Sequence, residues 1–115
     1  MIRRMKAKRR LKAEQQFVEA VTDFVVGLGT RPGTFYDYAL DTPAGLLHIS
    51  VHEGWVATRF EDVDQGLAFT ESCGRSSNPY SGKWNFHYTD MLSINVILAD
   101  LRYWFGLLMA WEPTS

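Results

Sequence analysis

The stretch LLHISVHEGWVATRF, from Leu46 to Phe60, decides the fold. Up to His52 it alternates between apolar and polar residues, which is the pattern of a strand with one buried face. Glu53 and Gly54 then form a two-residue hairpin turn, and such a turn fixes the register of the strands beside it. The predicted antiparallel pairs are Val51 with Val56, Ile49 with Thr58, and Leu47 with Phe60, which gives both strands one core face.

A strand is predicted on each side of this hairpin. Upstream, residues 35–40 are rich in aromatic side chains, and a four-residue turn from Thr42 to Gly45 would place Tyr36, Tyr38 and Leu40 on the core face. A five-residue turn would bury Asp37 instead. Downstream, residues 83–88 alternate again, with Trp84, Phe86 and Tyr88 facing inward.

Three helices are expected around these strands. The first spans residues 8–28, with its apolar residues on one stripe, and ends at the glycines that follow. A short helix begins near the acidic residues 61–64, with Val63 and Leu67 inward. The last helix has Thr89 as its N-cap. The core stripes are Phe17, Val21, Phe24, Val25 and Leu28 in the first helix, and Ile94, Ile97, Leu98, Leu101, Phe105 and Leu108 in the last.

These elements predict a single α+β domain. Its antiparallel sheet has about four strands, a three-stranded meander plus one, and a short helix stands between strands three and four. The N- and C-terminal helices pack on one face. The chain has 115 residues, 46% of them hydrophobic, which suits one domain over residues 13–115 with a basic arm at 1–12.

The basic arm concentrates charge of one sign. It holds seven of the twelve Lys and Arg residues and no acidic residue, whereas the rest of the chain has five basic and thirteen acidic residues. Such arms bind phosphate backbones or anionic membranes, and the alternative is a solvated start of the first helix. The nucleic-acid candidates are Arg3, Arg4, Lys6, Lys8, Arg9, Arg10 and Lys12, together with Arg59 and Lys83.

The outward face of the sheet is a second candidate site. Its polar and aromatic residues are His48, His52, Trp55, Asn85 and His87. Rings and basic side chains on an open sheet can hold single-stranded nucleic acid, and the alternative is an ordinary wet face. His48 and His52 would lie about 13 Å apart on one strand, too far to share a metal ion. We therefore predict no metal site and no cofactor.

The last helix carries a second apolar stripe, of Trp104, Leu107 and Trp111, beside its core stripe. Either the first helix covers this stripe or the stripe is a protein interface, joined by Tyr80 from the loop at residues 74–82.

Several classes of protein are disfavoured. Cys73 is the only cysteine, so the chain forms no internal disulfide, and we expect a cytoplasmic protein. Charged residues such as Asp100 and Arg102 interrupt the apolar stretch at 91–111, which argues against a membrane span. No catalytic signature stands out, although nothing in the sequence rules out an enzyme.

Three segments resemble small uncharacterised proteins of bacterial phages, plasmids and other mobile elements. They are DTPAGLLHIS from Asp41, WVATRFEDV from Trp55 and NPYSGKWNFH from Asn78. The resemblance covers about the middle half of the chain and implies a bacterial cytoplasm, with no activity to carry over.

The leading functional hypothesis is a small non-catalytic binding protein that engages a protein partner or a second copy of itself. The first alternative is a nucleic-acid-associated protein that uses the basic arm. The second is a small enzyme with a histidine-containing site on the sheet face.

Overall fold

The computed structural model describes residues 2–73, 82–88 and 92–113, with side chains from Lys12 onward. Among these described residues, five strands form one antiparallel sheet whose spatial order follows the chain. They are β1 (Arg31–Pro32), β2 (Tyr38–Thr42), β3 (Gly45–His52), β4 (Trp55–Phe60) and β5 (Lys83–His87). The α+β class is confirmed, and the sheet has one more strand than predicted, the short β1.

Both predicted registers are confirmed. Across the hairpin of β3 and β4, Leu47 pairs with Phe60 and Val51 with Val56. Across β2 and β3, Leu40 pairs with Leu47, as the four-residue turn requires. Gly54 has a φ of 79°, which is the left-handed conformation that a two-residue hairpin turn needs and that glycine adopts without strain.

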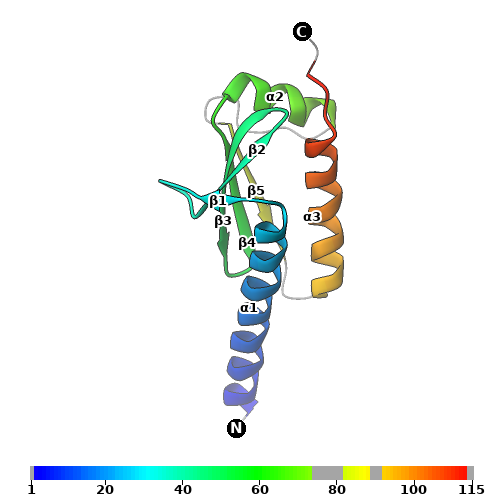
Figure 1. Ribbon diagram of the computed structural model, residues 1–115. Helices are drawn as coiled ribbons and strands as arrows, with labels where there is room; N and C mark the ends of the chain where they lie inside the picture. The colour runs from blue at the N-terminus through cyan, green and yellow to red at the C-terminus, as the bar shows by residue number, and fades with distance from the viewer. Residues whose placement is uncertain (1, 74–81, 89–91, 114–115) are drawn as a thin grey trace.

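Three helices accompany the sheet: α1 (Ile2–Gly27), α2 (Val63–Ser72) and α3 (Ile94–Met109). In Figure 1, α1 and α3 lie side by side on one face of the sheet, and α2 lies across one end. Within the part of the chain that the structure describes, no helix is long and apolar enough to cross a membrane.

The core lies between the sheet and the two long helices. On α1, Phe17, Val21 and Val25 are buried, which confirms the predicted stripe. On α3 the predicted stripe is incomplete, because Trp104 is also fully buried. Its indole packs against Phe60, Phe69, Phe86 and Phe105. Trp104, which the sequence placed on a second stripe that is either covered or an interface, is therefore covered and belongs to the core.

The strand predicted at residues 35–40 starts later and ends later. β2 begins at Tyr38, and Phe35, in the bend before it, is 94% exposed. Tyr36 was expected on the core face. Its ring instead lies 5.9 Å from that of His48, which faces the other side of the sheet. The tight bend at residues 33–37, closed by a hydrogen bond from the Gly33 amide to the Asp37 carbonyl, replaces the extended chain that the prediction assumed.

Two helix details also differ from prediction. The N-cap of α3 is Ser93, whose side chain accepts a hydrogen bond from the Val96 amide, rather than Thr89, which lies outside the described residues. On α2 the buried residues are Gly66, Phe69 and Thr70, whereas the predicted Val63 and Leu67 are only half-buried.

The N-terminal part of α1 continues beyond the sheet. The helix has 26 residues, about 39 Å at 1.5 Å per residue. Figure 1 shows its first turns projecting past the end of the body, and the longest dimension of the protein is 60 Å. The basic arm is thus the projecting end of a continuous helix.

Candidate binding site on the open sheet face

One face of the sheet has no helix against it among the described residues, because α1 and α3 both pack on the opposite face. We call this surface the open sheet face. Strand pairing arranges its side chains in rows that run across the strands, and neighbouring rows are two residues apart along each strand.

The row nearest the turn between β3 and β4 consists of three aromatic rings. His52 pairs with Trp55, and Trp55 pairs with His87 on β5. The indole lies between the two imidazoles, with ring centroids 4.1 Å and 5.5 Å apart and planes within 14° of parallel. His52 and His87 are exposed and Trp55 is half-buried. We call these three residues the ring row.

Four residues further along the strands lies a basic row. His48 pairs with Arg59, and Arg59 pairs with Lys83. Arg59 and Lys83 are both exposed. At 3.3 Å per residue, this row lies about 13 Å from the ring row.

Pairing extends the basic row to Arg31 on β1, through Ala39. The charge of Arg31 is compensated, however, because its guanidinium lies 2.6 Å from the Asp41 carboxylate. The hydrogen bond from Arg31 to Asp41, and the attraction between their charges, raise the pKa of Arg31. Over the described residues, no carboxylate forms an ion pair with the other two cations of this row, Arg59 and Lys83.

The strip between the two rows carries shorter side chains: Ser50, Ala57 and Asn85. Ser50 is 8% and Ala57 6% exposed, although no described helix covers them, whereas Asn85 is exposed. The Ser50 hydroxyl also accepts a hydrogen bond from the Asp37 amide. The bend at residues 33–37 therefore reaches the β3 side of this strip.

His48 is on the open sheet face as predicted, but it is buried. Its Nε2 lies 2.6 Å from Glu61 Oε2, and the Tyr36 ring is tilted against its ring, with 5.9 Å between the centroids. Only 10% of its side chain is exposed. His48 and His87 lie in different rows of the open sheet face, so the face does not bring these two histidines together.

The three histidines do not converge on a metal either. The indole of Trp55 separates His52 from His87. Over the described residues, no three side chains of His, Cys, Asp or Glu are grouped closely enough to hold an ion.

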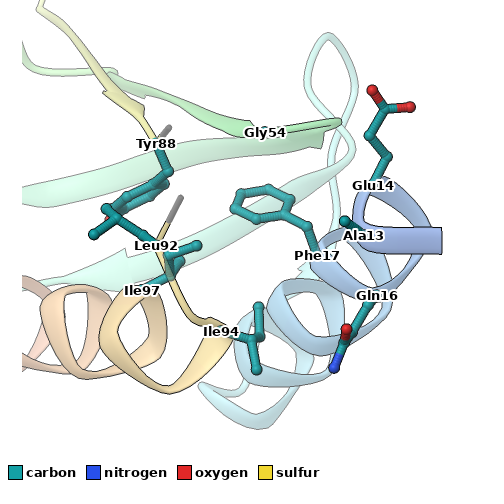
Figure 2. Close-up of a pocket in the computed structure, with 9 residues that line it drawn as sticks. All are labelled: Ala13, Glu14, Gln16, Phe17, Gly54, Tyr88, Leu92, Ile94 and Ile97. Carbon is teal, nitrogen blue, oxygen red and sulfur yellow. The ribbon is translucent and has the colours of Figure 1, made fainter. Parts of the chain in front are cut away.

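On the opposite side of the same hairpin turn, a pocket of about 90 Å³ shows where α1 meets the body (Figure 2). Ala13 and Phe17 from α1, Gly54 from the turn, and Tyr88 are among its lining residues. The Phe17 ring points toward Gly54 and Tyr88, 6.1 Å from the Tyr88 ring. Residue 54 stands between His52 and Trp55 along the chain, so the basic arm leaves the body at the same end of the sheet as the ring row, on the other face.

The structure separates the predicted interface residues. Trp104 is in the core, and Trp111 is half-buried with its ring edge-on to Phe69. Leu107 is 37% exposed, whereas Tyr80 lies outside the described residues, as do the side chains of residues 2–11. The more exposed residues of α3 are ones that the sequence did not single out, Tyr103 at 64% and Val96 at 51%.

Comparison of the chain with protein-family models, with curated proteins and with solved structures gives no match. The resemblance to mobile-element proteins therefore stays a prediction, and the functional argument rests on the residues themselves.

Proposed function

We propose that this protein binds nucleic acid, with the basic arm and the cations of the basic row, Arg59 and Lys83, on the phosphate backbone. The observation that carries the proposal is the position of the arm. The pocket at Ala13 and Gly54 puts the root of the arm at the same end of the sheet as the ring row, on the other face, and the basic row lies about 13 Å further along the strands.

The charge distribution supports a polyanionic ligand. The first turn of α1 contains no acidic residue, and the arm places seven basic residues at the end of the helix where the dipole is already positive. Like charges in one helical segment repel one another, and a polyanion along the arm relieves that repulsion. Counterion release from the polyanion adds a favourable, salt-dependent contribution to the binding free energy.

The test is binding of a labelled nucleic acid to the full chain, followed by fluorescence anisotropy over a series of salt concentrations. For a single strand, each phosphate neutralised contributes about 0.7 to the slope of log affinity against log salt. The triple variant Arg9→Gln, Arg10→Gln, Lys12→Gln keeps good helix-forming residues and should lower that slope by about 2.

The matched control is Arg102→Gln, which removes one exposed cation from α3, on the far side of the core. Its slope should equal that of the unmodified protein. Binding that does not respond to salt, or no binding at low salt, would overturn the proposal.

A protein-partner function is the second candidate, as the sequence first suggested. Its support is the exposed apolar group of Val96, Tyr103 and Leu107 on α3. Light scattering on a sizing column should then show a dimer that persists at high salt and becomes a monomer in Tyr103→Glu. A monomer at every concentration would remove self-association through α3.

A further inference from the structure

The three rings of the ring row stack on one another, and the proposed binding of phosphates does not involve these rings. Parallel planes and centroid distances of 4.1 Å and 5.5 Å mean that each imidazole covers one face of the Trp55 indole. A ligand ring cannot lie flat on Trp55. The free ring faces are those at the two ends of the stack, on His52 and on His87.

The end of the stack at His87 is open. β5 is the last strand in the order of the sheet, and no described strand lies beyond it. At the other end, His52 is exposed and no β2 residue pairs with it, although the bend at residues 33–37 lies on that side and reaches the open sheet face at Ser50. Both imidazoles are exposed, so a planar heterocycle can extend the stack at either end.

The rest of the open sheet face suits the backbone attached to such a heterocycle. The side chains of the strip, Ser50, Ala57 and Asn85, are uncharged, and beyond the strip Arg59 and Lys83 provide two exposed cations. A chain that stacks a base on the ring row can cross this strip and place a phosphate at the basic row about 13 Å away.

We infer that the open sheet face binds unpaired nucleotides of a single strand and stacks a base on the end of the ring row. This inference rests on the proposed function and names its ligand. In a duplex the flat faces of the bases are occupied by neighbouring base pairs, so a stacking site at ring faces selects unpaired bases. The basic arm, by contrast, responds to phosphates in either form.

The experiment compares three labelled probes of equal length with the full chain at one low salt concentration. They are oligothymidine, a random-sequence duplex, and an abasic oligonucleotide that has the same phosphates and no bases. The unmodified protein should bind oligothymidine about tenfold more tightly than the abasic probe, which is the scale of one stacked base.

Two substitutions locate the stacking site. The double variant His52→Ala, His87→Ala should reduce the preference for oligothymidine over the abasic probe to about twofold or less. The variant His52→Phe, His87→Phe keeps two planar rings and should retain the preference. Tyr103→Ala, which removes an exposed ring from α3, should leave it unchanged.

The outcomes separate the inference from the function on which it rests. Equal, salt-dependent binding of all three probes would overturn the stacking site and leave phosphate binding intact. A preference for oligothymidine that persists in the double alanine variant would also overturn the ring row as its site. No binding of any probe at low salt would overturn both.

Discussion

Gly66 of α2 lies directly against the ring of Phe60, the last residue of β4. A Cβ built on Gly66 would stand 2.4 Å from Phe60 Cγ and 2.6 Å from its Cβ. Atoms so close to the backbone of Phe60 cannot move aside as the end of a flexible side chain can. The absence of a side chain at position 66 therefore sets how closely α2 approaches the end of the sheet.

Gly66→Ala should accordingly destabilise the protein, by about 1–3 kcal/mol, because overpacking forces the helix or the ring to shift. The control is Gly106→Ala, at an exposed position of α3 where a Cβ would meet nothing within 4 Å. That change should stabilise the protein by about 0.5–1 kcal/mol, through helix propensity alone. Urea unfolding measures the free energy of unfolding of both variants. Equal changes in the two variants would contradict the close approach of α2 to Phe60.

Trp104→Ala should lower the free energy of unfolding by about 3–5 kcal/mol, since it empties a fully buried site among four phenylalanine rings. Trp111→Ala removes the same side chain from a half-buried position at the C-terminal end of α3 and should cost clearly less. Urea unfolding of the two variants compares them. A greater loss of unfolding free energy in Trp111→Ala than in Trp104→Ala would contradict the position of Trp104 in the core.

Arg59→Gln and Lys83→Gln should each reduce the salt-dependence slope of single-strand binding by about 0.7, because each removes one cation from the basic row. Arg31→Gln is the control within the same cross-strand row, and it should change the slope little because Asp41 already compensates Arg31. Anisotropy titrations over a series of salt concentrations give the slopes. An equal reduction of the slope in all three variants would contradict this prediction. It would mean that the ion pair with Asp41 does not weaken the contribution of Arg31 to binding.

Much of the sheet could be predicted from the sequence because its registers are set locally. Alternation with period two and the short turn at Glu53 and Gly54 allow only one pairing that buries Leu47 and Val56 together. The same reasoning gave the pairing of Leu40 with Leu47, but it failed at Tyr36, where a bend replaces the strand. A bend closed by its own backbone hydrogen bond leaves little trace in the alternation of side chains.

The orientation of α3 could not be predicted in the same way. This helix has apolar residues around most of its circumference, so periodicity alone does not decide which side is buried. The rings of Phe60, Phe69 and Phe86, which come from three other elements, select Trp104 for the core and leave Tyr103 and Leu107 outside. For that reason the exposed apolar group of α3 consists of Val96, Tyr103 and Leu107 and does not include Trp104.

By itself the sequence determined the elements with strong local signals: the hairpin at residues 46–60, the buried stripe of α1, and the concentration of positive charge in the first twelve residues. Only the tertiary structure decided which distant residues meet. His52 and Trp55 are neighbours through a turn of two residues, but His87 joins them from more than thirty residues away, through the pairing of β5 with β4. Side-chain alternation shows which face of a strand a residue occupies, whereas the strand beside it is chosen by the packing of the whole core.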